Sequence, residues 1–597
     1  MAITTYWADS YVEKKRTGPE AIRLIKPGQR VFIGSSCGEP QYLVKELFAV
    51  LHIFTDLEII RLFRLESTPL TLTADKTADQ KWQPFCHPGR PMTLRENRSK
   101  EQTLNIRSFY LGSARPEEIA KDIRFITPIN LSAVPRLFKS RKLPIHVALI
   151  QVSPSDDFGW MSLGVSVDVT LAAALSADLV IAQVNSRMPR VLGRSFIHVN
   201  DVDVIVEHEE QILTIREVQE TEFSGDIGRH VARLVDDGST IQIGLGAAPH
   251  AILLALSDKN DLGIHTQYLT NDIMDLVSKG VVTNRKKGFN EGKLVASSAI
   301  GTETLYDFMD DNPGIEFHPS DYVNDPGIIS RHNRMVSLNV AMAMDLTGQV
   351  AADAFSCNHF TGVTGMLDFI RGATQAEGGK SILMLPSTDG QGKESRIVPF
   401  MKDTAIIVPR GDVHYVVTEY GVVNLFGKSM QERALSMISI AHPDFRNALF
   451  DEAKNMGLIS AERTSTKSIG SIYPLKLEET VAINGDLITF RPAKPVDERR
   501  IQEHFYTMDK RDILSRFFQE KDSFVRAEAE DMSLIDYIKE LTIVAVMGEP
   551  GFEKVVGVGE YLLDQKKNMA EVAFSVSKEW QGRGLGKILL RKLSEAA

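Results

Sequence analysis

The sequence predicts an α/β protein: two tandem α/β domains with mostly parallel sheets, followed by a third, partial α/β domain. Three observations lead to this prediction. Short apolar runs rich in β-branched residues alternate with helical segments along most of the chain. One strand–turn–helix pattern occurs twice, in residues 18–51 and 236–256. After about residue 485 the composition shifts, and a new series of strands and helices follows.

The repeated pattern is a glycine, a short strand, a turn of small residues and a leucine-rich helix. In the first copy the strand covers 30–33 and the turn 34–40. In the second copy the strand covers 241–245 and runs into the turn GLGAAP, residues 244–249. Any two strand–helix units look alike to some degree, but here the features recur in the same order. We therefore expect two domains built alike.

Other segments complete the predicted sheets. Between the two repeats, nearly continuous apolar runs predict parallel strands covered on both faces, at 144–150, 177–184 and 202–206. In the last part of the chain we expect strands at 541–546, 555–559 and 570–576, and then a helix carrying Ile588, Leu589, Leu590 and Leu593. The expected domains are 1–225, 226–480 and 481–597.

Length and composition exclude several classes of protein. A chain of 597 residues is too long for one hydrophobic core. Its net charge of −10 argues against nucleic acid or an anionic membrane as the main partner. The sequence shows neither an apolar run near the ~20 residues of a membrane span nor a signal peptide. Three cysteines make neither a disulfide framework nor a metal set, so we expect a cytoplasmic protein without bound metal.

The second copy of the repeat contains the first candidate binding site. The turn Gly244-Leu245-Gly246-Ala247 joins a strand to the N-terminus of a helix. Such a turn offers free backbone N–H groups to an anion or to a polarised carbonyl. Farther on, GIHTQ at 263–267 predicts a second strand end, and Asn271 is expected to cap the helix of 273–277.

This stretch resembles the acetyl-CoA hydrolase/transferase family, which includes 4-hydroxybutyrate CoA-transferases. Members carry an IG-x-GA-x-P turn followed by G-I-H-[TS]-E. The resemblance covers about residues 18–460, with further blocks at 147–199, 316–349, 361–373, 380–400 and 416–446. It implies two open α/β/α domains of the CoA-transferase type. It also implies coenzyme A or acetyl-CoA as substrate, a small carboxylate as acceptor, and a homodimer or larger assembly.

The resemblance further implies a catalytic glutamate, and Gln267 stands at its position. In the family that glutamate attacks the acyl-CoA thioester and becomes a glutamyl-CoA thioester. A carboxylate is a competent nucleophile, whereas a neutral amide is a poor one. A family glycine loop that approaches CoA is matched by Gly362 and Gly365, but Thr364 and Met366 replace a glycine and a glutamine. The candidate CoA-binding residues are Gly244, Gly246, Ala247, Gly362 and Gly365.

Four other side chains were considered for chemistry. His265, near the altered position, is either a packed, hydrogen-bonded histidine or a catalyst. Cys37, in the first-half turn SSCGEP, offers a thiol, although in the family the first half does not hold the nucleophile. Asp272 and Asp275 either replace the missing carboxylate or stabilise the N-terminus of their helix through its dipole.

The C-terminal stretch resembles the GNAT N-acetyltransferases, in particular the protein-lysine acetyltransferase branch. Its motif [QR]-x-x-G-x-[GA], between a strand and a helix, binds the CoA pyrophosphate. The matching candidates are Gln581, Gly582, Arg583, Gly584 and Gly586. Glu571, on the preceding strand, is either the base for an amine acceptor or an exposed strand carboxylate. A GNAT fold normally continues beyond this helix, so we expect a truncated domain with an exposed sheet edge.

Three functions remain open from the sequence. The first is an active CoA-transferase or acetyl-CoA hydrolase that uses another nucleophile or water. The second is a module that binds CoA thioesters without covalent transfer and regulates or supplies a fused acetyltransferase. The third is an oligomeric scaffold. Gln267 favours the second over the first, and the retained turn at Gly244–Gly246 favours ligand binding over a scaffold.

Overall fold

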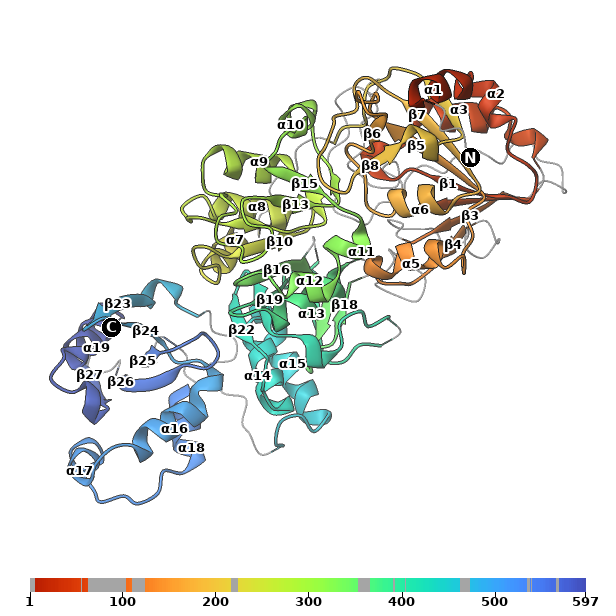
Figure 1. Cartoon of the computed structure of the whole chain (residues 1–597). Helices are drawn as coiled ribbons and strands as arrows, with labels where there is room; N and C mark the ends of the chain where they lie inside the picture. Colours follow the sequence, from red (N-terminus) through yellow and green to blue (C-terminus); the bar gives the residue numbers. More distant parts are fainter. Residues whose placement is uncertain are drawn as a thin grey trace. The chain divides into compact units, whose positions relative to one another are not determined.

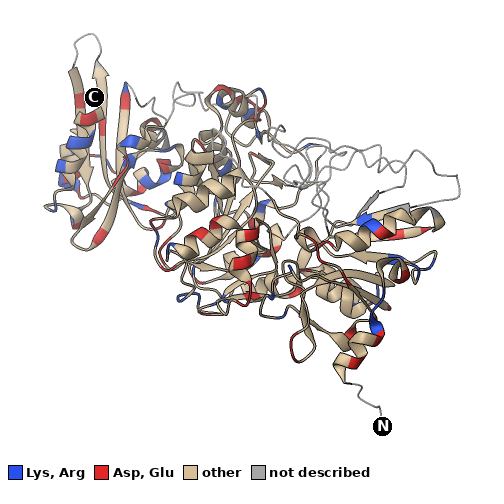
Figure 2. Cartoon of the chain, turned by 90° about the horizontal axis from the view of Figure 1, so that it is seen from above, with Lys and Arg blue, Asp and Glu red and all other residues tan. Residues whose placement is uncertain are grey.

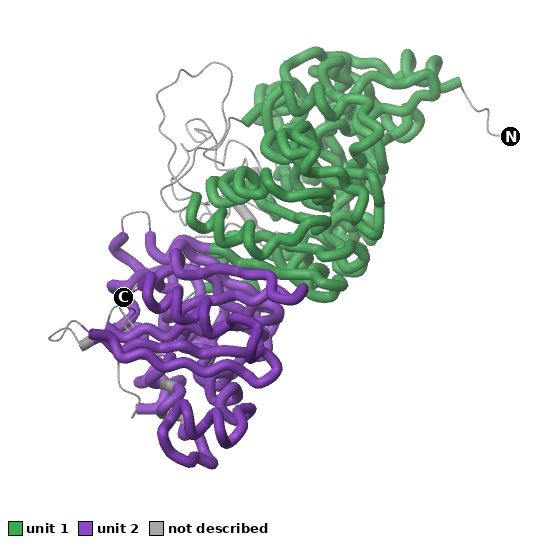
Figure 3. Tube along the Cα trace, turned by 90° about the vertical axis from the view of Figure 1, so that its left-hand side faces the viewer, with its two compact units in different colours: residues 1–342, 351–384, 403–408 green, residues 343–350, 385–402, 409–597 purple. Residues whose placement is uncertain are grey.

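The computed structural model describes residues 6–54, 56–62, 104–109, 124–215, 224–352, 365–389, 392–402, 404–461, 473–533, 537, 539–564 and 569–596. The fold is α/β, as predicted (Figure 1). The chain forms two compact units (Figure 3). The first unit contains Met1–Met342, Ala351–Met384 and Asp403–Val408, and the second contains Ala343–Val350, Leu385–Lys402 and Pro409–Ala597. The expected domain boundaries at 225/226 and 480/481 stay a prediction.

A seven-stranded parallel sheet forms the N-terminal half of the first unit. Its strands in spatial order are β4 (Arg124–Ile126), β3 (Leu104–Ser108), β2 (Leu57–Arg61), β1 (Arg30–Ile33), β5 (Val147–Val152), β7 (Leu179–Val184) and β9 (Val204–Glu207). The predicted strands at 144–150, 177–184 and 202–206 are confirmed as β5, β7 and β9. Helices of this half are α1 (Trp7–Lys14), α2 (Gly18–Ile22), α3 (Gln41–Ala49), α5 (Val134–Lys139) and α6 (Thr170–Ser176). β5 is buried along its whole length, as coverage of both faces requires.

A second parallel sheet forms the other half of the first unit. Its strands in this unit are β11 (Gly263–Ile264), β10 (Thr240–Ile243), β16 (Met335–Val340) and β19 (Lys380–Met384). The short strands β12 (Tyr268–Leu269) and β14 (Ser298–Ala299) pair in parallel, as do β13 (Leu294–Ala296) and β15 (Ile315–Phe317). The helices are α7 (Ser224–Ala232), α8 (Ala247–Ala255), α9 (Asn271–Ser278), α10 (Glu303–Met309), α11 (Ser320–Val323), α12 (Pro326–Ile329) and α13 (Met366–Gln375).

The internal repeat is confirmed. β1 leads through a turn to α3, and β10 leads through a turn to α8. The glycine before each strand has a positive φ, 78° at Gly28 and 76° at Gly238. This left-handed backbone is why the pattern needs glycine there. The same order of glycine, strand, turn and helix therefore starts both halves, although the first turn also contains a short 3-10 helix, Ser36–Gly38.

An antiparallel sheet forms the C-terminal part of the second unit. Its strands in order are β23 (Glu479–Ile483), β24 (Asp486–Pro492), β25 (Glu540–Met547), β26 (Lys554–Asp564) and β27 (Met569–Val576). The helices are α16 (Glu498–Tyr506), α17 (Lys510–Phe517), α18 (Arg526–Ser533) and α19 (Leu585–Ala596). The three predicted strands and the final helix are confirmed as β25, β26, β27 and α19. Among the described residues β27 is an edge strand, as expected.

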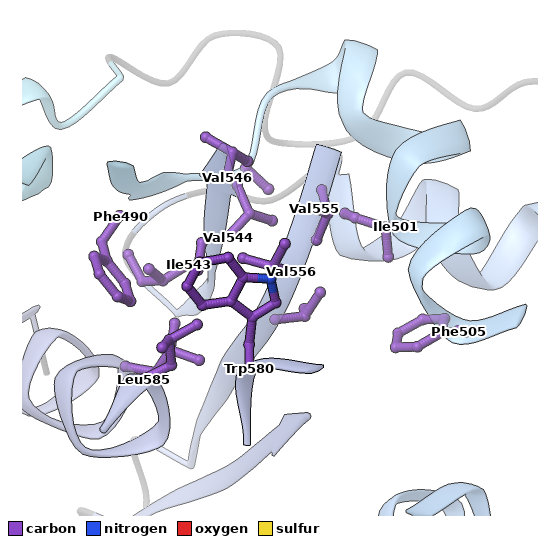
Figure 4. Close-up of a cluster of buried hydrophobic side chains, with 14 of the residues drawn as sticks. Phe490, Ile501, Phe505, Ile543, Val544, Val546, Val555, Val556, Trp580 and Leu585 are labelled. Carbon is purple, nitrogen blue, oxygen red and sulfur yellow. The ribbon is translucent and has the colours of Figure 1, made fainter. Parts of the chain in front are cut away.

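A hydrophobic core fills the space between this sheet and its helices. Trp580 lies with its indole among Ile543, Val544 and Val556, and Leu585 packs beside it (Figure 4). On the α19 side, a Cβ added at Gly557 or Gly559 would lie 3.3 Å from the side chain of Leu589 or Leu593. These glycines let α19 approach the sheet closely. The indole and α19 thereby hold residues 581–586 at the end of β27.

The rest of the second unit packs against this sheet. It includes β17 (Ala343–Asp345), β20 (Ile397–Val398), the β21–β22 hairpin (Tyr415–Thr418, Gly421–Asn424), α14 (Met430–Ser439) and α15 (Pro443–Asn455). The Tyr415 hydroxyl donates to Glu549 Oε1 and to the Pro550 carbonyl, both at 3.1 Å. The ring of Phe552 lies edge-on to Phe426 at 6.1 Å. The turn between β25 and β26 is therefore held against the β21–β22 hairpin.

A buried ion-pair network shapes that turn. Arg491 donates to both carboxylate oxygens of Asp497, at 2.7 and 2.9 Å. Arg500 pairs with Asp497 at 3.0 Å and with Glu553 at 2.8 Å. Asp497 is fully buried, and despite that burial the guanidinium of Arg491 holds its pKa below the usual range. A buried carboxylate in this state depends on its partners.

Replacing Asp497 by asparagine is expected to destabilise the second unit by about 3–5 kcal/mol, because the buried guanidinium of Arg491 loses its bidentate carboxylate and keeps only the longer pair with Glu553, at 3.6 Å. Calorimetric melting of the full chain measures this as a lower Tm for the second unit's transition. Glu503→Gln is the control, since Glu503 pairs with Arg499 at the surface and such pairs contribute about 1 kcal/mol or less. Equal effects of the two substitutions would contradict the account.

Charged side chains of both signs are spread over the molecule. Lys and Arg lie interspersed with Asp and Glu along the elements of both units (Figure 2). Within the described part of the chain, no helix is both long and apolar enough to cross a membrane. The described residues also include no group of three or more His, Cys, Asp or Glu side chains placed to hold a metal ion.

Candidate functional site

The predicted glycine turn lies at the carboxyl end of β10. Gly246 is the residue before α8 and has a φ of 126°, a conformation that favours glycine. A Cβ added at Gly244 would meet no atom within 4 Å, so this side of the turn is open. The first helical turn begins at Ala247, and its N–H groups precede the first intrahelical hydrogen bonds. The turn can therefore receive an anionic or polarised ligand group.

Gln267 lies at the same edge of the sheet. β10 and β11 are parallel, and Thr266 donates its hydroxyl to the Ile243 carbonyl at 3.0 Å. Gln267 follows directly and is half-buried. Its backbone carbonyl accepts from the N–H groups of Ser297 and Ser298, and its side-chain Nε2 lies 2.7 Å from the Tyr268 hydroxyl. The carboxyl ends of parallel strands thus place Gln267 near the glycine turn.

Gly365 and Asn324 complete this arrangement. A Cβ added at Gly365 would lie 3.1 Å from Gln267 Oε1 and 1.9 Å from Asn324 Nδ2, so only glycine fits between these amides. Asn324 is fully buried, and neither of its amide atoms has a hydrogen-bond partner among the residues that the structure describes. An unpaired buried amide costs free energy unless a ligand satisfies it. We call Gln267, Asn324, Gly365 and the turn Gly244–Ala247 the Gln267 site.

The other residues predicted near Gln267 add little to the description of the Gln267 site. Met366, which replaces the family glutamine, begins α13 and is buried. Gly362 and Thr364 lie outside the described residues, so their predicted part in the glycine loop stays a prediction. Asn271 does not cap α9: Thr270 occupies that position, and the Asn271 amide donates to Thr302 Oγ1 at 2.8 Å.

The alternative nucleophiles and bases have other roles. His265 is fully buried, its Nε2 is 2.8 Å from the Val323 carbonyl, and burial lowers its pKa well below the usual value. It is a packed, hydrogen-bonded histidine. Burial raises the pKa of the Cys37 thiol to about 11, which leaves it an inert thiol. Asp272 pairs with His250 at 2.9 Å in the first turn of α9, and Asp275 is exposed on the same helix.

A buried lysine lies beneath the Gln267 site. The Nζ of Lys287 donates to the carbonyls of Ile264 and Lys293, each at 2.7 Å, and the side chain is fully buried. Burial lowers the pKa of Lys287 to about 7, and the field of Glu316 offsets only part of this effect. A lysine in this state makes the stability of the fold depend on pH.

We expect Lys287→Met to change the pH dependence of the first unit's stability. Between pH 7 and 10.5 the unfolded chain holds the Lys287 proton and the folded chain does not, so the wild type gains stability as pH rises. The stability advantage of Lys287→Met over wild type should therefore shrink by about 1.4 kcal/mol per pH unit across this window. Melting curves at several pH values measure this, with the exposed Lys286→Met as control. A difference that does not vary with pH would contradict it.

A second candidate site lies at the end of β27. A cavity of about 310 Å³ is lined by Met508, Asp512, Ser515, Arg516, Phe574, Ser575, Val576, Trp580, Gln581, Gly582, Gly584, Leu585 and Gly586. Gly582 and Gly584 have φ values of 74° and 91°, so the loop depends on glycine at both positions. The loop opens directly into α19, whose first N–H groups face a ligand in such a loop. We call this the glycine-loop cavity.

The structure brings most of the predicted loop residues into this cavity. Gln581 lies at its rim, where its Nε2 donates to Asp512 Oδ2 at 2.7 Å. Arg583 is not among the lining residues, and its guanidinium lies over the Trp580 ring at 4.8 Å from the centroid. Glu571 is exposed on β27 and does not line the cavity, so its predicted role as base stays a prediction. Asp512 and Ser575 are not predicted from the sequence, because they reach the cavity only through tertiary packing.

The chain thus combines an α/β fold with largely parallel sheets, an antiparallel C-terminal sheet, and two glycine turns that each lead into a helix N-terminus. Comparison with known families matches residues 100–217 to the acetyl-CoA hydrolase/transferase N-terminal domain and 301–453 to its C-terminal domain. Residues 509–597 match the acetyltransferase (GNAT) family. The chain belongs to the acetyl-CoA hydrolase/transferase family and carries a C-terminal GNAT acetyltransferase domain.

Individual relatives support this assignment. The chain is 40% identical to the 4-hydroxybutyrate coenzyme A transferase of Clostridium kluyveri over 450 residues, 75% of this chain and 99% of that protein. The crystal structure of RipA from Yersinia pestis is 34% identical, covers 76% of this chain and 100% of its own, and superposes with a TM-score of 0.65. The crystal structure of the 4-hydroxybutyrate CoA-transferase of Porphyromonas gingivalis is 33% identical and superposes with a TM-score of 0.60. It covers 75% of this chain and 100% of its own. The resemblances to the acetyl-CoA hydrolase/transferase family and to the GNAT family are confirmed, and the protein-lysine acetyltransferase branch stays a prediction.

Proposed function

We propose that the Gln267 site binds a CoA thioester, such as acetyl-CoA or 4-hydroxybutyryl-CoA, without forming a covalent acyl-enzyme. The position of the Gln267 amide carries this proposal. It lies beside Gly365 and Asn324, at the sheet edge that also holds the open glycine turn. An amide cannot attack a thioester as a carboxylate does. It can still donate or accept a hydrogen bond, as the unpaired amide of Asn324 can.

The residues of this site suit the binding of a thioester. The N–H groups at the start of α8 are placed to bind a polarised carbonyl or a phosphate oxygen. Asn324 supplies a buried amide that has no partner among the described residues and that a ligand can satisfy. Gly365 keeps the space between the two amides free of a side chain. The site can thus bind a CoA thioester, but it lacks the nucleophile that would form the covalent acyl-enzyme.

For the C-terminal domain we propose transfer of the acetyl group from acetyl-CoA to an amine. The N–H groups of the loop 582–586 bind the pyrophosphate, and the open loop supports this role. Glu571 accepts a proton from the attacking ammonium, so that the free amine nitrogen attacks the acetyl carbonyl and the CoA thiolate leaves. The chain is proposed to act as a homodimer or larger assembly, as the resemblance implies, and to act in the cytoplasm.

Titration of the full chain with acetyl-CoA tests this proposal. We expect two binding sites for each chain, one at the Gln267 site and one at the glycine-loop cavity. Asn324→Ala should weaken binding at the first site, because the buried amide no longer pairs with the ligand. Absence of binding at the Gln267 site would contradict the proposed role of the CoA-transferase part and favour a scaffold.

A further inference from the structure

The glycine-loop cavity contains a polar pair that links it to α16. Ser575 lines the cavity, and its Oγ lies 2.9 Å from Nε2 of His504. The other ring nitrogen of His504, Nδ1, lies 3.1 Å from Oγ of Ser577. Side chains two positions apart on a strand share one face, so the Ser-Val-Ser sequence at the end of β27 presents both hydroxyls to α16. One imidazole thereby holds two serines.

The chemistry of the ring fixes how these hydroxyls are used. His504 is 2% exposed, and burial lowers its pKa to about 4, so the imidazole is neutral at physiological pH. A neutral imidazole has one N–H and one lone pair. The lone pair can therefore accept from one serine, and the N–H is available to the other serine or to the backbone of Val555. The hydrogen bond to His504 restrains the Ser575 side chain, which also lines the cavity.

The charged groups that line the cavity each have a partner, although Nε of Arg516 has none among the described residues. Asp512 accepts from Gln581, and Arg516 is paired with Glu560 on β26. Ser515 also lines the cavity, but it is exposed on α17, whereas Ser575 is 6% exposed. Ser575 is thus a buried, oriented hydroxyl that is anchored by a neutral group. This combination suits recognition of an uncharged polar part of a ligand better than recognition of a phosphate.

The position of Ser575 along β27 indicates which part of the ligand it meets. The loop at 582–586 follows the strand, and Glu571 precedes Ser575 on the same face by four residues, or ~13 Å at ~3.3 Å per residue. With the phosphates of acetyl-CoA on the loop and its acetyl group near Glu571, the arm between them passes Ser575.

We propose that Ser575 hydrogen-bonds the pantetheine–acyl arm of acetyl-CoA and that His504 is the positioning residue that orients its hydroxyl. The proposal rests on the acetyl-CoA-binding function proposed above for the C-terminal domain. Two ligands separate the arm from the nucleotide: acetyl-CoA, and adenosine 3′,5′-bisphosphate, which has the nucleotide but no arm. Both are titrated into the full chain, and binding at this site is identified by its loss in Gly584→Asp.

Ser575→Ala should weaken acetyl-CoA binding at this site about five- to tenfold, the effect of one lost hydrogen bond. It should leave the bisphosphate unaffected, because that ligand does not reach Ser575. Ser594→Ala, which removes an exposed hydroxyl on α19, is the matched control. A merely structural role of Ser575 would weaken both ligands alike, and that outcome would overturn the proposal. So would unchanged binding of acetyl-CoA.

His504→Phe should reproduce the loss seen in Ser575→Ala, and the double variant should be no weaker than either single one, because the two residues act as a unit. His504→Gln keeps a donor and an acceptor and should restore most of the affinity. Additive losses would overturn the positioning role even if Ser575 contacts the ligand. If the wild type binds neither ligand at the loop, the proposed function and this inference both fail. If it binds both and Ser575→Ala has no effect, only the inference fails.

Discussion

Gln267→Glu is expected to give the chain CoA-transferase activity. The new carboxylate has the shape of the amide that it replaces. In the wild type Gln267 Nε2 donates to the Tyr268 hydroxyl at 2.7 Å, and in the variant this hydroxyl can donate to the carboxylate instead. The carboxylate attacks the acyl-CoA thioester and releases CoA thiolate, leaving a mixed anhydride. The thiolate then reopens the anhydride at the glutamyl carbonyl, releasing the carboxylic acid as its anion and leaving a glutamyl-CoA thioester.

The measurement is exchange of CoA between acetyl-CoA and 4-hydroxybutyrate or another small carboxylate. We expect the rate to rise on the order of 100-fold or more above wild type, the scale on which a catalytic group acts. Borohydride reduction should trap the thioester at position 267 of the variant. Gln267→Ala is the control, because it opens the site without adding a nucleophile and should stay at background. Equal rates for glutamate and alanine would show that position 267 does not limit the chemistry.

Gly584→Asp is expected to abolish acetyl-CoA binding at the glycine-loop cavity. Gly584 has a φ of 91° and lines the cavity, and a carboxylate there faces the pyrophosphate of the ligand. The like charges repel each other, and the new side chain covers the N–H groups of the loop. Titration of the full chain with acetyl-CoA should then show one site where the wild type shows two.

Gly485→Asp separates this effect from backbone strain. Gly485 has a φ of 94° in the β23–β24 turn, and a Cβ added at either glycine meets no atom within 4 Å. Both substitutions therefore carry the same strain, but only Gly584→Asp changes the cavity. Comparable melting temperatures with a difference in binding are expected. If Gly584→Asp keeps both sites, the loop does not bind the pyrophosphate.

Local sequence patterns predicted most of the fold. The runs at β5 and β7 are continuous in apolar character because both faces of the sheet are covered, and this signal needs no tertiary information. The β23–β24 hairpin was missed, although its turn Asn484-Gly485 carries a hairpin signal, with φ values of 55° and 94°. The composition shift after about residue 485 predicts the start of a new domain there, whereas the hairpin already begins at Glu479. Asn271 was placed one residue from the true cap, within the usual uncertainty of helix ends.

The candidate sites were predicted only in part. The turn at Gly244–Gly246 and the loop at 582–586 are local motifs, and the structure places both at helix N-termini. Asn324 and the His504–Ser575 pair could not be predicted, because each depends on segments that meet only after folding. His504 and Ser575 are 71 residues apart in the sequence. Nothing in a single sequence shows such pairs. The glutamine at position 267 can be recognised from the sequence, because it stands where the family motif has a glutamate.

Intact-mass spectrometry of the wild-type chain incubated with acetyl-CoA tests the central claim most directly. The same sample is titrated to establish that the Gln267 site is occupied. We predict binding without any covalent acetyl or CoA adduct, and CoA exchange with small carboxylates at background. A stable or borohydride-trapped adduct on any residue of the Gln267 site, with turnover above background, would contradict the account and show that another group carries the acyl transfer.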